Sequence, residues 1–234
     1  MPTARPTPRR TAIVASLAVL SVLGLTAART AALSAAPAAT TTTSTTSAAT
    51  GQLEPSDRWL DGLKSKHRQF FDTPAPNGGV PLVHVLNYYE TYNKAYGIKD
   101  ADIDAVLTFY GSTTFHALSD AAWAKYQLGE FLGVNDPVSG KPATSNPWRA
   151  APVILRHTLP NASLEALHAR GATLIVCNNA LQIFAGMLGA KRGLEAGDVY
   201  ADLKANILPG VDLVPGMVVA VEQATRAGLS YHRQ

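Results

Sequence analysis

The stretch that decides the fold is Ala172-Thr173-Leu174-Ile175-Val176-Cys177-Asn178-Asn179-Ala180-Leu181. Its first half, residues 172–176, is a short apolar run with β-branched residues, which is typical of a buried strand. The residues from Asn179 to Gly189 have the composition of a helix that ends at a glycine. The segment therefore predicts a strand that passes directly into a helix, with the chain's single cysteine at the junction.

Strand and helix patterns alternate in both directions from this segment. The other predicted strands are residues 80–86, 103–110, 211–214 and 229–232. The other predicted helices are residues 87–97, 118–132, 194–208 and 216–227, with one more from Asn161 or Ser163 to about Arg170. The intervals between the strands are too long for hairpins. We therefore expect an α/β fold, a three-layer sandwich with a mainly parallel sheet of about five strands and helices on both faces.

The composition fits one folded domain behind an amino-terminal extension. Of the 234 residues, 47% are hydrophobic and 16% are charged, which excludes disorder over the whole length. We expect a single α/β domain over residues 51–234, in which residues 51–79 wrap around the core. Residues 134–152 contain four prolines and a glycine, so we expect a long loop or lid there.

Residues 1–38 have the layout of an export signal. Adjacent arginines at positions 9 and 10 precede an apolar run over residues 12–28, and small residues that suit cleavage follow. The arginine pair resembles a twin-arginine signal, with ordinary Sec export as the alternative. The run is shorter than the roughly 20 residues that cross a membrane. We therefore expect a periplasmic or secreted protein with no stable membrane span after signal cleavage, with an uncleaved anchor as the alternative, and a disordered Ala/Thr/Ser leader over residues 39–50.

The charge of the chain gives no sign of a nucleic-acid partner. The formal net charge is +3, but the first 50 residues hold four arginines and no acid. Residues 51–234 therefore carry 16 basic and 17 acidic side chains. A body of nearly balanced charge has no global attraction to phosphate backbones, so we expect no nucleic-acid partner.

Polar residues follow three of the predicted strands. These residues are Asn87 after the first strand, Gly111, Ser112, Thr113 and His116 after the second, and Cys177, Asn178 and Asn179 after the third. The carboxyl ends of parallel strands meet at one edge of a sheet, where helix amino termini point backbone N–H groups into a crevice. We therefore predict a site at this edge.

Cys177 is the candidate nucleophile of that site. A single cysteine excludes an intramolecular disulfide framework and a cysteine-rich zinc site. A thiol at the start of a helix lies near the positive end of the helix dipole and near free N–H groups, which favour the nucleophilic thiolate. The alternative is that Cys177 packs as a small buried apolar residue.

The segment Leu174–Leu181 resembles the strand–cysteine–helix signature of the DsrE/DsrF-like (YchN-like fold) sulfur-relay family. Residues 211–216, the helix after them and residues 227–231 resemble the end of that family, and the order of elements agrees from about residue 80 to residue 232. The resemblance implies that Cys177 accepts sulfane sulfur and passes it on as a persulfide, without a cofactor. It also implies sulfur donor and acceptor proteins, or small sulfane-sulfur compounds, as partners, and assembly into a homo-oligomer.

The asparagines after Cys177 and two of the histidines also have expected roles. Asn178 and Asn179 could donate hydrogen bonds to the anionic persulfide. His116 could act as a base or orient the cysteine, with a structural histidine as the alternative. His84 is expected to be a core histidine of the first strand, and no histidine pair has the i, i+4 spacing of a metal site, so we predict no metal.

Two other classes of protein remain as alternatives. One is a non-catalytic module for small-ligand binding or assembly, in which Cys177 only packs. The other is a metal or redox-cofactor protein that uses His116 with Cys177.

Overall fold

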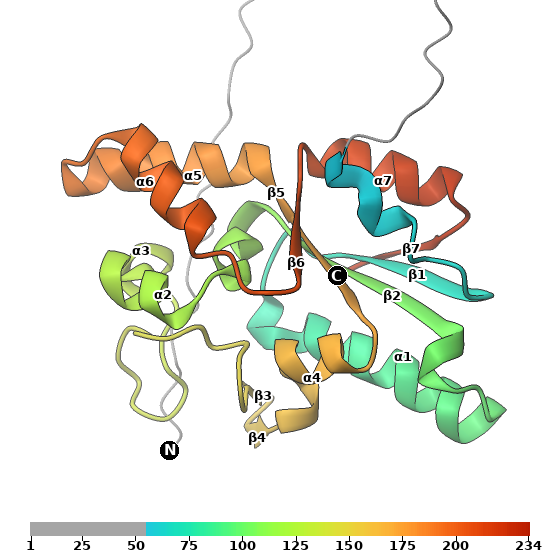
Figure 1. Cartoon of the computed structure of the whole chain (residues 1–234). Coiled ribbons are helices and arrows are strands. Elements are labelled where there is room, and N and C mark those ends of the chain that lie inside the picture. Colours follow the sequence, from blue (N-terminus) through green and yellow to red (C-terminus); the bar gives the residue numbers. More distant parts are fainter. Residues whose placement is uncertain (1–54) are drawn as a thin grey trace, which may run out of the picture. The chain divides into compact units, whose positions relative to one another are not determined.

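A five-stranded sheet lies at the centre of the computed structural model, which describes residues 55–234 (Figure 1). The strands have the order β6-β5-β2-β1-β7, and every neighbouring pair is parallel. Their bounds are β1 His67–Asp72, β2 Ile103–Phe109, β5 Thr173–Cys177, β6 Val211–Val214 and β7 Ser230–Arg233. The predicted parallel sheet of about five strands is confirmed. The predicted export signal and leader lie outside the described residues.

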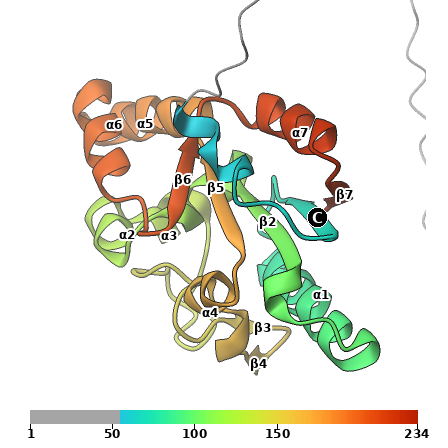
Figure 2. The same ribbon diagram turned by 45° about the vertical axis from the view of Figure 1, so that its right-hand side comes forward.

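Helices cover both faces of the sheet, as expected for a three-layer sandwich (Figures 1 and 2). On one face lie α1 (Val80–Tyr96) and α4 (Leu164–Ala169), and on the other lie α5 (Asn178–Arg192), α6 (Ala196–Ala205) and α7 (Met217–Arg226). The smaller elements are α2 (Asp120–Tyr126), α3 (Leu128–Leu132), the hairpin β3 (Val153–Ile154) and β4 (His157–Thr158), and 3₁₀ turns at Pro55–Leu60, Asn77–Gly79, Asp100–Asp102, Gly111–Ala117 and Pro160–Ala162.

Side chains of β5 alternate between two apolar clusters, one on each face of the sheet. Leu174 and Val176 pack into the cluster that includes the buried residues of α1 and α4. Ile175 and Cys177 pack into the cluster that includes the buried residues of α7. This period of two is the normal consequence of strand geometry, and it places the thiol on the α7 face of the sheet.

The expected strand over residues 80–86 is wrong, because these residues form the first two turns of α1. Pro81 occupies an early helical position, where its missing N–H costs nothing. The buried side chains Leu82, Val85 and Tyr89 recur at helical spacing, which a count of apolar residues alone did not distinguish from a strand. The first strand of the sheet is instead β1, within the segment expected only to wrap around the core.

The expected helix over residues 118–132 is divided into α2 and α3. The break falls at Gln127, which has a left-handed φ of 48° and cannot continue a right-handed helix. The long loop predicted over residues 134–152 is confirmed, since these residues contain no helix and only an isolated bridge between Asn135 and Pro142. None of the helices between residues 55 and 234 is both long and apolar enough to cross a membrane.

Candidate functional site

Cys177 lies where two helices begin. It is the last residue of β5 and the N-cap of α5, and its Sγ accepts a hydrogen bond from the backbone N–H of Ala180 at 3.4 Å. A second N–H, that of Met217 in the first turn of α7, donates to the same sulfur at 3.3 Å. Figure 1 shows α5 and α7 running in opposite directions from the ends of β5 and β6. Two backbone N–H groups, each at the start of a helix, therefore point at this one sulfur.

The thiol is only slightly accessible. Cys177 is 5% exposed and packs among the apolar residues that α7 and the central strands bury. At the nearby surface, the backbone N–H of Asn179 donates to the carbonyl of Pro215 at 3.3 Å. A Cβ on Gly216 would lie 3.3 Å from Nδ2 of Asn179. The side-chain amide of Asn179 thus lies against the glycine that precedes α7.

The two asparagines after the cysteine have different environments. Asn178 is half-buried, and its Oδ1 accepts a hydrogen bond from the hydroxyl of Tyr200 at 2.6 Å. Asn179 is exposed at the junction of α5 and α7. Only the side chain of Asn179 is therefore free to reorient toward a group bound near the cysteine.

Three polar residues that the sequence analysis did not select lie along the same edge and face of the sheet. Tyr110 directly follows β2, and the register Phe109 to Val176 makes it the neighbour of Cys177 on the next strand. It packs against the same apolar cluster as Cys177. Burial raises the pKa of Tyr110, and the carboxylate of Asp72 raises it further. The phenol is therefore a neutral hydrogen-bond donor at any physiological pH.

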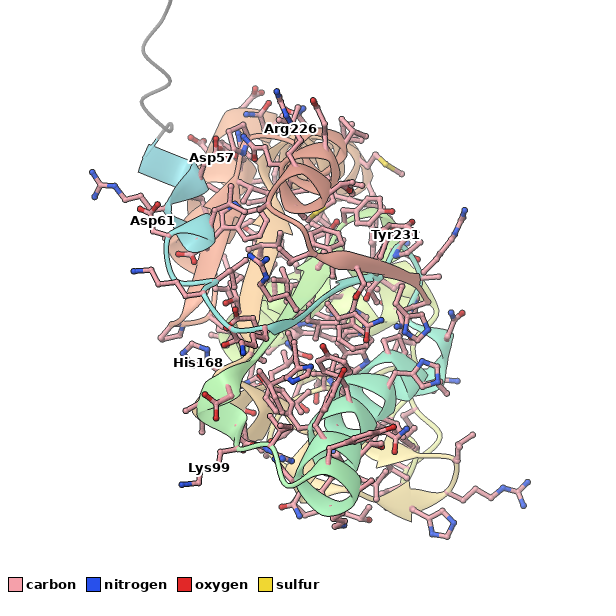
Figure 3. All side chains as sticks on the ribbon, turned by 90° about the vertical axis from the view of Figure 1, so that its right-hand side faces the viewer. Asp57, Asp61, Lys99, His168, Arg226 and Tyr231 are labelled. Atoms are coloured by element: carbon pink, nitrogen blue, oxygen red, sulfur yellow. The ribbon has the colours of Figure 1, made fainter. Side chains whose placement is uncertain are left out.

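Asp72 ends β1 and is 4% exposed. The hydroxyl of Tyr231 on β7 donates a hydrogen bond to its Oδ2, and its Oδ1 has no hydrogen-bond partner among the described residues. Figure 3, which looks onto the β7 edge of the sheet, labels Tyr231 on β7 between α7 and α1. Because β1 was not expected as a strand, its polar last residue could not be assigned to the sheet edge from the sequence.

The segment Gly111-Ser112-Thr113 connects the ends of β2 and β1. Ser112 donates to the carbonyl of Pro74 through its backbone N–H at 3.0 Å and through its hydroxyl at 3.1 Å. The hydroxyl of Thr113 donates toward the carbonyl of Thr73 at 2.5 Å. Gly111 has a φ of 56°, and a Cβ there would lie 2.8 Å from the carbonyl oxygen of Pro74. The hydrogen bonds of Ser112 and Thr113 hold the neighbouring loop in place, and Gly111 allows the close approach of that loop.

His116 is buried between two tryptophan rings. The centroid of its imidazole lies 5.3 Å from that of Trp123 and 4.3 Å from that of Trp148. Burial lowers the pKa of His116 to about 3, so its imidazole is neutral. Its Nδ1 has no hydrogen-bond partner among the described residues. The residue lines a cavity of about 260 Å³ together with part of the 134–152 loop. No hydrogen bond or ring contact joins His116 to Cys177 in the described structure.

Asn87 lies away from the strand ends. It is an exposed residue in the middle of α1, and its Oδ1 accepts a hydrogen bond from Thr91 at 3.3 Å. The expectation that Asn87 follows a strand was wrong because residues 80–86 are helical. The structure thus brings Cys177 together with Asn178 and Asn179, and it places Asn87 on another element.

Neither a metal site nor a known relative assigns a function to these residues. Within residues 55–234, no three His, Cys, Asp or Glu side chains lie close enough together to hold a metal ion. The fold and the strand-end cysteine define the class as a parallel α/β sandwich with a thiol between two helix amino termini. Comparison of the chain with models of protein families, with characterised proteins and with solved structures found no match.

Proposed function

We propose that the protein carries sulfane sulfur as a persulfide on Cys177, as an exported relative of the DsrE/DsrF-like sulfur-relay proteins. The observation that carries the proposal is the pair of backbone N–H groups, from Ala180 and Met217, that converge on Sγ. Donors of this kind stabilise a thiolate or persulfide anion more strongly than a neutral thiol.

The proposed loading step is a nucleophilic displacement on sulfur. The thiolate of Cys177 attacks the outer sulfur of thiosulfate, and a bond forms between Sγ and that sulfur. The S–S bond of thiosulfate breaks, and sulfite leaves with its electron pair. In the unloading step, an acceptor thiolate attacks the outer sulfur and Cys177 leaves as the thiolate. Charge and atoms balance in both steps, so the cycle needs neither a redox cofactor nor a metal.

The residues around the cysteine have distinct roles in this proposal. The N–H groups of Ala180 and Met217 stabilise the thiolate that leaves on unloading. The exposed amide of Asn179 donates to the outer sulfur, while Asn178, held by Tyr200, keeps the start of α5 in position. The low exposure of Cys177 protects the persulfide from competing thiols.

The location and partners belong to the same proposal. Export by the twin-arginine-like signal would deliver the folded carrier to the periplasm or the exterior. Small sulfane-sulfur compounds, or donor and acceptor proteins, would supply and remove the sulfur there. The protein is proposed to act as a homo-oligomer, as the resemblance implies.

One observation favours a second candidate, a non-catalytic binding or assembly module. Cys177 is 5% exposed and contacts an apolar cluster, which also suits a cysteine that only packs. In that case Cys177→Ser would lose no function, and no sulfur would be held.

The mass of the intact protein tests the proposal. The reduced full chain and its Cys177→Ser variant are exposed to thiosulfate or polysulfide, freed from excess donor and weighed. We expect the wild type alone to gain whole sulfur atoms, and dithiothreitol to remove them. If a control peptide thiol is loaded under the same conditions and the protein gains nothing, the carrier function is excluded and the binding module is favoured.

A further inference from the structure

A long groove lies between α1 and the sheet, on the face opposite to Cys177. It encloses about 540 Å³, a volume typical of small-molecule sites. Seven of its ten lining side chains carry rings, and the other three carry an amide or an aliphatic hydroxyl. The ring residues are His67, Phe71, His84, Tyr88, Tyr92, Tyr96 and His232, and the others are Gln69, Asn87 and Thr91. We call the groove that these residues line the α1 groove.

One wall of the α1 groove is a ladder of rings along the helix. His84, Tyr88, Tyr92 and Tyr96 follow one another at intervals of four residues, so they share one face of α1. Each step advances about 6 Å along the helix axis, and the ladder is about 18 Å long. The ring centroid of Tyr92 lies 5.0 Å from that of Tyr88 and 5.5 Å from that of Tyr96. The wall therefore offers repeated ring positions to an extended ligand.

The facing wall comes from the sheet. His67, Gln69 and Phe71 alternate along β1, and His232 lies on β7 opposite Phe71. Ring contacts join the two walls at three places. The centroids of His67 and Tyr92 lie 4.3 Å apart, those of Phe71 and Tyr88 5.5 Å apart, and those of His84 and His232 5.4 Å apart. Tyr96, which is 68% exposed, extends the ladder beyond the sheet. Phe71 is buried and Tyr88 and Tyr92 are half-buried against the core, so Tyr96 is the ring of the ladder that is most open to a ligand.

The lining carries no Lys, Arg, Asp or Glu among the described residues. Burial, and secondarily the neighbouring His84, lowers the pKa of His232, so this imidazole is uncharged at neutral pH. A site without lysine or arginine does not suit single-stranded nucleic acids, which need a basic groove beside their stacking rings. The α1 groove therefore suits an uncharged ligand.

The polar groups of the α1 groove both donate and accept hydrogen bonds. The side-chain amides of Gln69 and Asn87 and the hydroxyl of Thr91 each offer at least one acceptor. A proline-rich peptide also docks in aromatic grooves, but it presents mainly carbonyl acceptors and needs donors alone. A chain of sugar rings presents C–H faces that pack on aromatic rings and hydroxyls that both donate and accept.

We propose that the α1 groove binds a linear, uncharged oligosaccharide, whose successive rings pack along Tyr88, Tyr92 and Tyr96. The hydroxyls of the sugar bind the amides of Gln69 and Asn87 and the hydroxyl of Thr91 along the open side of the groove. The site is independent of the sulfur chemistry, because Cys177 lies on the other face of the sheet.

Titration calorimetry of the full chain with cellotetraose, maltotetraose and tetra-N-acetylchitotetraose tests this proposal. We expect at least one of them to bind, and Tyr96→Ala to weaken the affinity about three- to tenfold, the value of one aromatic contact. Lys94→Ala is the matched control, because Lys94 is an exposed residue of the same helix outside the groove. Both variants change exposed side chains, so the fold should be retained, and circular dichroism checks it.

Each other outcome overturns the proposal. Failure of all three tetrasaccharides to bind the folded protein at millimolar concentration excludes it. Equal affinities of Tyr96→Ala and wild type would place the sugar elsewhere. Binding of a decaproline peptide without binding of any sugar would assign the groove to a protein partner. The Cys177→Ser variant is expected to bind the sugar as the wild type does, so failure of the carrier function would leave this result unchanged.

Discussion

The backbone N–H of Met217 donates a hydrogen bond to Sγ of Cys177 at 3.3 Å, across 40 positions of the chain. The contact joins the start of α7 to the end of β5. It depends on the short connection from β6 to α7, in which Gly216 has an extended backbone with φ −156° and ψ 131°. Two neighbouring βα units thus share one sulfur atom, which neither unit would contact in this way alone.

Removal of this N–H should slow the reaction of the thiol. Proline at position 217 lacks the N–H, fits the first position of a helix, and follows a residue whose ψ already suits a proline. We expect Met217→Pro to react with iodoacetamide about fivefold more slowly than Met217→Ala, because one hydrogen bond to the thiolate is lost. Both variants lose the same buried side chain, so Met217→Ala is the control. Equal alkylation rates would show that the donor does not activate the sulfur.

The same two hydrogen bonds predict the stability of variants at position 177. Cys177→Ala leaves the N–H groups of Ala180 and Met217 without their acceptor, and we expect the free energy of unfolding to fall by about 1–2 kcal/mol. Cys177→Ser retains an oxygen acceptor of a type preferred at the N-cap, so its loss should be smaller. Urea denaturation of both variants measures the difference. A serine variant less stable than the alanine variant would contradict the assignment of Cys177 as a capping acceptor.

The close approach of Gly216 to the side chain of Asn179 predicts how access to the sulfur of Cys177 is controlled. A methyl group at position 216 would lie 3.3 Å from Nδ2 of Asn179, so that exposed amide must shift. We expect Gly216→Ala to remain folded and to load sulfur several-fold more slowly in the mass experiment. Gly186→Ala on α5 is the control, because its new Cβ would meet no atom within 4 Å. Unchanged loading in Gly216→Ala would remove Asn179 from the proposed mechanism.

The 134–152 loop packs too closely on α3 to allow a larger residue there. A Cβ at Gly129 would lie 2.2 Å from the carbonyl oxygen and 2.3 Å from the nitrogen of Ala143. We expect Gly129→Ala to cost about 1–3 kcal/mol in urea denaturation, through overpacking against backbone. Faster proteolysis within residues 134–152 should accompany this loss. Gly197→Ala in α6, whose Cβ would meet nothing within 4 Å, should not reproduce either effect.

The sequence was sufficient to place Cys177 because the strand before it is short, apolar and bounded by Gly171 and a helix. The same reasoning failed at residues 80–86, whose valines and leucines also fit a strand. It missed β1, because His67, Arg68 and Gln69 are polar and only Phe70 and Phe71 indicate a core position. Neighbouring strands and helices decide which apolar run is buried, and that information is not local to either segment.

The site shows the same limit. The contact between Cys177 and Met217 requires the order of β5 and β6, and the contact between Asp72 and Tyr231 requires β1 and β7 to be neighbours. Neither pair is close in sequence. The position of His116 after β2 was predictable, whereas its burial between Trp123 and Trp148 depends on the path of the 134–152 loop.

The buried imidazole of His116 predicts a loss of stability in acid. Its pKa is about 3 in the folded protein, lowered by burial from the ordinary value of 6.5. Between pH 6.5 and pH 3 the unfolded chain therefore binds a proton at this residue that the folded chain does not bind. The free energy of unfolding should fall as the pH falls through this window, by at most about 1.4 kcal/mol per pH unit from this group.

The variant His116→Phe isolates this contribution, because it keeps a ring between the two tryptophans and removes the titrating group. We expect urea denaturation between pH 6.5 and pH 4 to show a smaller loss of stability in His116→Phe than in the wild type. His157→Gln changes an exposed histidine and should retain the slope of the wild type. Parallel curves for His116→Phe and the wild type would mean that His116 takes up a proton in the folded state, and that the cavity beside it admits a charged imidazolium.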